Sequence, residues 1–108
     1  IFQIKPMTKF GNLIDERKTP VLINFYANWD DQCKDVHLVL RDVAAAIGDQ
    51  AKVVKINVDN NEELAEALRV KSLPTFVIYL FGEMVWRKSG HLDANALVAH
   101  LQQHQPNG

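Results

Sequence analysis

The sequence has only one cysteine, Cys33, among its 108 residues. A disulfide within the chain and a four-cysteine zinc site are therefore both excluded. An excess of one charge is also missing: 12 basic and 13 acidic residues give a net charge of −1, without the cluster of Lys and Arg that marks a nucleic-acid-binding surface. The longest uninterrupted apolar run, 76–81, is far shorter than the roughly 20 residues that a membrane-spanning helix needs. The sequence predicts no nucleic-acid partner, no membrane span, no bound metal and no cofactor.

The chain is apolar enough to fold around a core of its own. Apolar residues make up 47% of it, which lies in the usual range for a globular protein, and its length suits one domain. We predict that domain over residues 1–104 and a disordered tail over 105–108. The first residue is Ile1 rather than Met, which indicates a processed or trimmed start and leaves open a longer parent chain. A cytoplasmic location is expected.

Strands and helices are predicted to alternate along the whole chain. Strands are expected at about 2–5, 21–27, 52–58, 75–81 and 84–88, and helices at about 7–16, 30–47, 60–68 and 93–101. Asp30 and Asp93 are the expected N-caps of the second and last of these helices. Helices between buried strands predict an α/β protein with a parallel sheet covered on both faces. The hairpin at 75–88 must add an antiparallel part, because a tight turn reverses the chain.

Several short motifs occur in one order along the chain. The apolar strand 21–27 leads to Trp29, and Cys33 is followed by Lys34. Further along the chain are Leu73-Pro74-Thr75, Phe81-Gly82-Glu83 and Ser89-Gly90. In this order and spacing the motifs resemble the thioredoxin family over about residues 2–101. The resemblance implies a thioredoxin fold with a central five-stranded mixed sheet in the order 1-3-2-4-5, four flanking helices and a cis peptide bond before Pro74.

The same resemblance shows where this chain departs from the family pattern. Asp30 stands at the position of the attacking cysteine, Asn24 at that of a buried aspartate, and Leu38 at that of a helix-kinking proline. A straighter helix is therefore expected around Leu38. Thiol–disulfide exchange needs one thiolate to attack and a second thiol to resolve the mixed disulfide. A chain with one cysteine cannot complete that cycle alone, and Asp30 cannot take part in sulfur chemistry.

Cys33 corresponds by resemblance to the family's resolving cysteine, and three roles stay open for it. A position in the first turn of a helix lowers a thiol pKa, whereas Asp30 and Asp31 raise it, so little net activation is expected. An inert packed cysteine is the first interpretation. A reactive monothiol is the second, and a metal ligand is the third.

Two histidine spacings carry weaker hypotheses. His37 lies four residues after Cys33 and would share its helix face, where a Cys–His pair could activate the thiol. His100 and His104 have the same spacing and could grip a metal, although no third ligand accompanies them. For all three histidines a plain solvated side chain is the competing interpretation.

The resemblance also implies a shallow groove that binds polypeptides. The predicted polypeptide-binding residues are Trp29, Asp30, Asp31, Gln32, Leu73, Pro74, Gly90 and His91. An exposed Trp29 beside a cis-proline loop suits an extended chain that adds backbone hydrogen bonds. Alternatively, Trp29 only covers the end of the sheet.

Three functions follow from these residues. The leading interpretation is a thioredoxin-like protein that has lost the C-x-x-C dithiol and serves as a polypeptide-binding or chaperone-type module, with client polypeptides or a partner protein. The alternative is a monothiol, glutathione-linked oxidoreductase of cell redox homeostasis, in which Cys33 is the catalytic residue. The third is a purely structural domain.

Overall fold

A computed structural model describes residues 2–3, 10–15 and 19–106 of the chain. The predicted strand residues 4–5, the ends of the predicted helix 7–16 and the last two residues of the predicted tail lie outside this described part. The strands are β1 (Phe2–Gln3), β2 (Val21–Tyr26), β3 (Lys52–Asn57), β4 (Thr75–Leu80) and β5 (Glu83–Ser89). The α-helices are α1 (Phe10–Ile14), α2 (Val36–Ile47), α3 (Glu62–Ala67) and α4 (Ala94–Gln103). Three short 3₁₀ helices are η2 (Asp31–Cys33), η3 (Gly48–Gln50) and η4 (Val58–Asn60).

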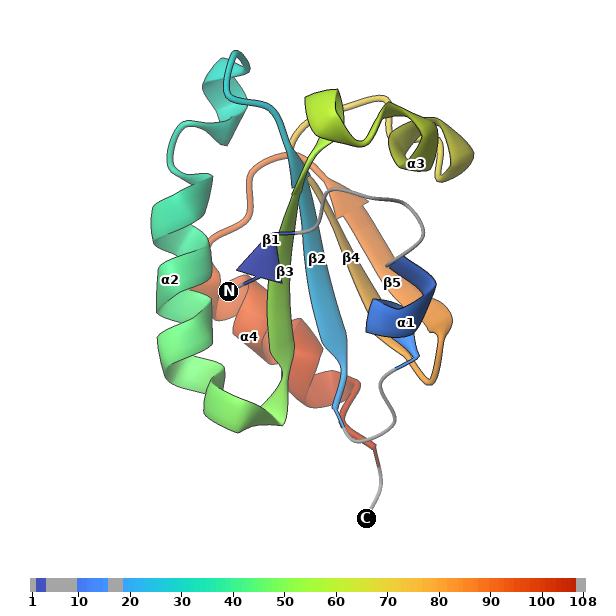
Figure 1. The fold of residues 1–108 in the computed structure, drawn as a ribbon. Coiled ribbons are helices and arrows are strands. Elements are labelled where there is room, and N and C mark those ends of the chain that lie inside the picture. The colour runs from blue at the N-terminus through green and yellow to red at the C-terminus, as the bar shows by residue number, and fades with distance from the viewer. Residues whose placement is uncertain (1, 4–9, 16–18, 107–108) are drawn as a thin grey trace.

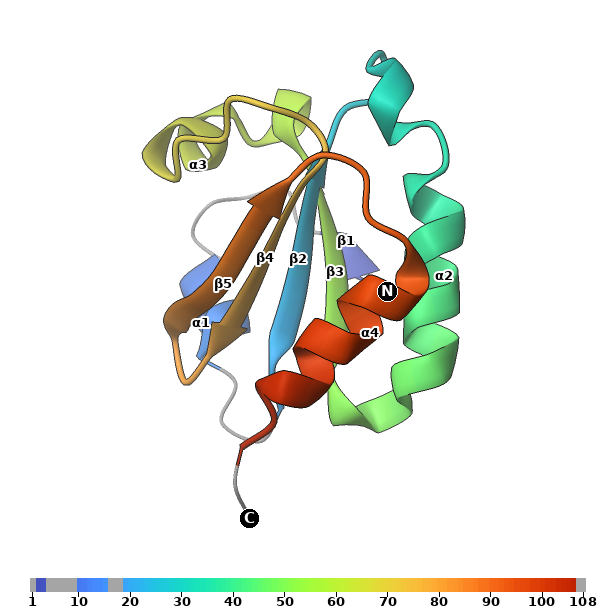
Figure 2. The same cartoon turned by 180° about the vertical axis from the view of Figure 1, so that it is seen from behind.

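The strands form one mixed sheet in the order β1-β3-β2-β4-β5, as predicted. The long strands β2 to β5 make up its body, and the two-residue β1 joins it beside β3. β3 runs parallel to β1 and β2, whereas β4 is antiparallel to both β2 and β5. Helices cover both faces: α1 lies on one of them in Figure 1, and α2 and α4 lie on the other in Figure 2. This is the α/β architecture of the thioredoxin fold.

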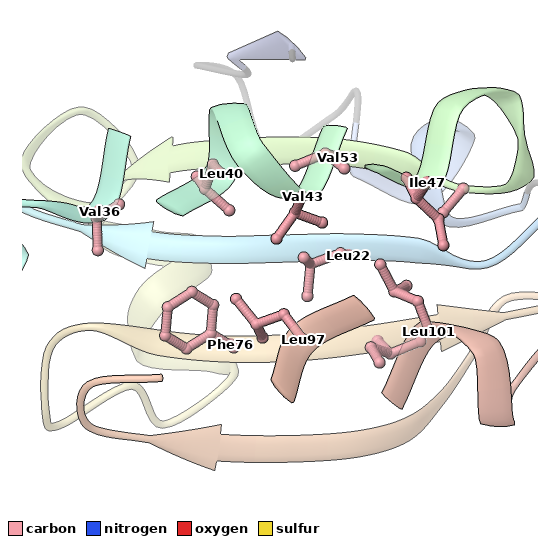
Figure 3. Close-up of a cluster of buried hydrophobic side chains, with 11 residues drawn as sticks. Leu22, Val36, Leu40, Val43, Ile47, Val53, Phe76, Leu97 and Leu101 are labelled. Carbon is pink, nitrogen blue, oxygen red and sulfur yellow. The ribbon is translucent and has the colours of Figure 1, made fainter. Parts of the chain in front are cut away.

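Each face of the sheet has its own hydrophobic core. Leu22 on β2 belongs to the core under α2 and α4, and its neighbour Ile23 belongs to the core under α1 and α3, because successive side chains of a strand point to opposite faces. On α2 an apolar row faces the first of these cores, opposite residues of α4 and of the sheet (Figure 3), and it consists of Val36, Leu40, Val43 and Ile47. Leu40 in that row is completely buried, which stabilises the fold by about 1.5–3 kcal/mol.

The predicted helix 30–47 is wrong at its start. The chain forms the 3₁₀ helix η2, passes through a turn at Lys34 and Asp35, and begins the regular helix only at Val36. Asp35 occupies the N-cap of α2, a position that suits aspartate far better than the interior of a helix does. The predicted helix 30–47 is therefore two pieces, and Cys33 belongs to the first and not to α2, which runs unbroken past Leu38.

The other predicted caps and turns agree with the structure. The Asp93 carboxylate accepts a hydrogen bond from the Ala96 amide at 2.8 Å and caps α4. In the hairpin, Phe81 and Gly82 have φ angles of +55° and +79°, the pair of positive values that a two-residue type I′ turn between twisted strands requires. None of the described helices is long and apolar enough to cross a membrane.

Candidate functional site

The predicted binding residues gather at one end of the sheet. β2 and β5 both finish there, and the antiparallel β4 starts there. The segment after β2 carries Trp29 and η2, the segment before β4 carries Leu73 and Pro74, and the segment after β5 carries Gly90. Residues that are far apart in the sequence are therefore neighbours at this end, which is at the top of Figure 1.

An open groove of about 490 Å³ lies between these segments. Five of the predicted binding residues line the groove: Trp29, Asp30, Gln32, Leu73 and Gly90. Trp29 is the most exposed large apolar side chain among the described residues, with 68% of its surface accessible. Three further lining residues are Lys71, Ser72 and Ser89, which lie within two residues of predicted ones in the chain but were not predicted to bind.

Three predicted binding residues do not line this groove. Asp31 is exposed on η2, and His91 is exposed just beyond Gly90. Pro74 is buried beneath the loop, and its peptide bond with Leu73 is cis, as predicted. Pro74 therefore affects the shape of the groove through its backbone and not through an exposed side chain.

Backbone and hydroxyl contacts lock the two loops of the groove together. The Gly90 amide donates a hydrogen bond to the Pro74 carbonyl at 2.8 Å, with Gly90 at a φ of +99°, where a side chain would be strained. The hydroxyl oxygens of Thr75 and Ser89 lie 2.9 Å apart, and the Thr75 hydroxyl also donates to the Ser72 carbonyl. These contacts tie the loop before β4 to the end of β5 and the segment after it.

Trp29 is fixed by a partner that the sequence did not reveal. Its indole Nε1 donates to both carboxylate oxygens of Asp59 on η4, at 2.9 and 3.2 Å. Beyond this contact lies a second open cavity, of about 660 Å³, between the loop before β4 and the segment formed by η4 and α3. We call it the α3 cavity. Trp29, Lys71 and Leu73 line both hollows and so stand between them.

Cys33 is buried, with 4% of its surface exposed. Burial raises the pKa of its thiol above the ordinary value, a backbone hydrogen bond at Ala27 lowers it in part, and the carboxylate of Asp30 raises it again. The thiol therefore stays protonated near neutral pH, and a protonated thiol is a poor nucleophile. This geometry fits the inert packed cysteine and opposes the reactive monothiol.

Asp30 has a structural task of its own. Its carboxylate Oδ1 accepts a hydrogen bond from the Gln32 amide at 2.8 Å, so it is the N-cap of η2. Its carbonyl accepts from the Cys33 amide at 3.0 Å. The N-cap role predicted for Asp30 is confirmed, although the helix that it caps is short.

Asn24 is completely buried in the middle of β2, as predicted. Its amide Nδ2 donates weakly to the carbonyls of Phe25 and Thr75, both at 3.4 Å, and its Oδ1 has no partner among the described residues. An amide side chain, unlike a carboxylate, neither takes up nor releases a proton near neutral pH. It therefore supplies no general base to Cys33.

His37 contacts residues other than Cys33. The Lys55 ammonium donates to His37 Nδ1 at 2.9 Å, and the imidazole meets the Tyr26 ring edge to face, with ring centroids 5.3 Å apart. Burial and the charge of Lys55 lower the pKa of His37, which therefore stays neutral at pH 7. A neutral imidazole that accepts from Lys55 gives no cation to stabilise a thiolate, so the expected Cys–His pair is not supported.

The two C-terminal histidines also take other partners. His104 Nδ1 lies 2.8 Å from the His100 carbonyl, and the His100 ring stacks on Trp86 with centroids 4.4 Å apart. Within the described residues no group of three His, Cys, Asp or Glu side chains is placed to hold a metal ion.

The strand order, the two helical layers and the loop with the cis Leu73–Pro74 bond define a protein of the thioredoxin fold. The chain belongs to the thioredoxin family, because the Thioredoxin family model matches residues 2–103. It is 33% identical over 95 residues to Thioredoxin Y, chloroplastic, of Oryza sativa subsp. japonica, covering 88% of this chain and 56% of that protein. It is 35% identical to Thioredoxin 1 of Synechococcus elongatus, covering 88% of this chain and 89% of that protein.

Solved structures agree with this assignment. The X-ray structure of Fasciola hepatica thioredoxin matches with a TM-score of 0.87 and 26% identity, over 97% of this chain and 100% of that one. Oxidised mitochondrial thioredoxin 3 of Saccharomyces cerevisiae matches with a TM-score of 0.84 and 28% identity, over 95% and 94%. This chain spans a little over half of the chloroplastic Thioredoxin Y proteins of rice and Arabidopsis thaliana, 56% of each.

Proposed function

We propose that this thioredoxin-family protein is a polypeptide-binding, chaperone-type module that performs no dithiol exchange of its own. The observation that carries the proposal is the contrast between two residues of one short segment. Trp29 stands 68% exposed at an open groove, whereas Cys33 is only 4% exposed and its pKa is raised. The proposed binding surface around Trp29 is open to a client polypeptide, whereas the sulfur atom of Cys33 is shielded from it.

The loss of the dithiol follows from the residues at the groove. Exchange through an internal pair needs an attacking thiolate at the mouth of the groove and a second thiol behind it. Asp30 lines the groove at the place that the family pattern gives to the attacking cysteine, and its carboxylate already caps η2. The remaining thiol of Cys33 lies behind it without a companion, since the sequence holds one cysteine.

Binding would use the side chains and backbone at the end of the sheet. Trp29 and Leu73 offer apolar surface, and a client in an extended conformation can place alternate side chains in the groove while its backbone bonds to the loops. The proposed surface also includes the exposed residues Asp31 and His91 at its rim. Pro74, which is buried, supports its floor. Aromatic anchors of this kind carry a large share of binding energy at interfaces.

A holdase assay tests the binding function. The protein is mixed with a chemically denatured client, and light scattering reports how far it delays aggregation. We expect Trp29→Ala to remove most of the protection. Leu38→Ala is the matched control, because Leu38 is 52% exposed on α2 and lines neither hollow. Equal protection by the wild type and Trp29→Ala contradicts the proposal.

Insulin reduction with dithiothreitol tests the missing chemistry. We expect the wild type and Cys33→Ser to give the same slow background rate. Catalysis by the wild type that Cys33→Ser abolishes overturns the proposal in favour of the monothiol alternative. A glutathione adduct at Cys33 after mild oxidation of the folded protein, detected by mass spectrometry, would support that alternative too.

A further inference from the structure

The α3 cavity adjoins the groove at Trp29. Trp29, Lys71 and Leu73 line both hollows, so a chain that lies in the groove can extend past the indole into the cavity. The floor of the cavity is apolar and is made by Val58, Ala65, Val70 and Leu73. At about 660 Å³ the cavity is large enough to hold one or two side chains of a client.

The wall of the cavity that belongs to η4 and α3 is acidic. It carries the carboxylates of Asp59, Glu62 and Glu66. Glu62 and Glu66 are four residues apart on α3 and therefore lie on one helix face. Among the described residues neither glutamate forms an ion pair, and the hydrogen-bond partner of Asp59, the Trp29 indole, is neutral. A cationic group of a ligand would be attracted to this wall, because opposite charges attract.

Basic residues also line the cavity, but they do not balance the acidic ones. Arg69 and Lys71 are the cationic residues that line the cavity. Asp30 in the groove adds a fourth carboxylate, so the two hollows together hold four acidic and two basic side chains, a net charge of −2. Three of these acidic residues line the same cavity as the apolar floor. A complementary ligand therefore combines a basic group with an apolar one.

We propose that the α3 cavity is a second subsite for the polypeptide in the groove, and that it selects segments in which a lysine or arginine accompanies an apolar residue. The apolar side chain packs on the floor, and the basic group reaches the carboxylates of Glu62 and Glu66. This inference rests on the proposed polypeptide-binding function and specifies which polypeptide segments the protein would select. The same carboxylates disfavour acidic segments, and such repulsion is an effective source of discrimination between partners.

Two fluorescein-labelled peptides test the inference by fluorescence anisotropy. They share one extended apolar sequence and differ only in two flanking residues, which are lysines in one peptide and glutamates in the other. We expect the wild type to bind the lysine peptide about threefold to tenfold more tightly in dilute buffer, the size of one or two exposed ion pairs. The preference should shrink as salt is added, because ions screen exposed charges.

Paired variants locate the selectivity. The double variant Glu62→Gln and Glu66→Gln should bring the two affinities within about twofold of each other. The control is Glu63→Gln with Glu83→Gln, which removes the same number of charges from exposed residues that do not line the cavity. We expect this control to keep the preference of the wild type.

The outcomes separate the inference from the function on which it rests. Equal binding of both peptides by the wild type, or the same loss of preference in both double variants, overturns the α3 subsite while polypeptide binding stands. Binding of neither peptide by the wild type overturns the proposed function and the subsite with it. A wild-type preference that only the Glu62 and Glu66 variant loses supports the subsite.

Discussion

Alkylation of Cys33 by iodoacetamide is the sharpest check on the proposed loss of sulfur chemistry. The reagent attacks thiolates, and an ordinary thiol with a pKa of about 8.5 is about 3% thiolate at pH 7. The raised pKa of Cys33 lowers that fraction, and burial of all but 4% of the side chain requires a local opening before the reagent can reach it. We expect the folded protein to react at least about tenfold more slowly than the urea-unfolded chain at the same pH.

Mass spectrometry of quenched samples across a range of pH measures this rate, and Cys33→Ser corrects for labelling elsewhere. A raised thiol pKa also has a consequence for stability. The unfolded chain releases the thiol proton at a lower pH than the folded protein, so the free energy of unfolding falls as the pH rises past the unfolded pKa. Cys33→Ser should remove that alkaline loss. Labelling of the folded protein at the unfolded rate near pH 7 refutes the argument from burial.

Four further predictions address the surface and the fold. Trp29→Ala should weaken client binding by about 2 kcal/mol or more while changing the melting temperature little, since the side chain is largely exposed; titration calorimetry and thermal melts separate the two effects. Leu40→Ala should cost about 2–5 kcal/mol in urea unfolding, because its side chain is completely buried. Arg87→Met should cost about 0.5–1.5 kcal/mol, because the exposed guanidinium donates to two carbonyls just after α3, and hydrogen exchange should show the loop before β4 loosening. Lowering the pH from about 7.5 to about 5.5 should destabilise the fold partly through His37, whose pKa is lowered by burial and by Lys55, so that the unfolded chain is the better proton acceptor below about pH 6.5; His37→Gln should reduce this acid loss in thermal melts, whereas an unchanged acid loss contradicts the lowered pKa of His37.

Local patterns were enough to predict the α/β class and the antiparallel hairpin, whereas the strand order came from the resemblance to the thioredoxin family. The apolar run of β2 needs cover on both faces and the periodic row of α2 needs cover on one, and few arrangements of alternating strands and helices supply both. Turn chemistry then set the hairpin, because Phe81 and Gly82 sit in the positive-φ turn that reverses the chain. These features depend on neighbours within a few residues, and such information is readable along a sequence.

The features that the sequence did not predict depend mostly on contacts between residues far apart in the chain. Periodicity could not show that the chain breaks at Lys34 and Asp35, because Cys33 and Val36 are both buried and fit one continuous helix equally well. The contact of His37 with Lys55 joins α2 to β3 and has no local signature. A signal for the α3 cavity was present, since Glu62 and Glu66 have the spacing of one helix face, but their nearness to Trp29 depends on how α3 packs.

The contacts that shape the binding surface are separate from the residues that would carry sulfur chemistry. Asp59 fixes the Trp29 indole, and the pairs Gly90–Pro74 and Thr75–Ser89 fix the loops, and none of these hydrogen bonds involves the side chain of Cys33. The hydrogen bonds that shape the groove therefore do not depend on sulfur chemistry at this end of the sheet. Because the surface does not depend on the thiol, Cys33→Ser should leave peptide affinity within about twofold of the wild type, and a larger loss would show that the two properties are coupled after all.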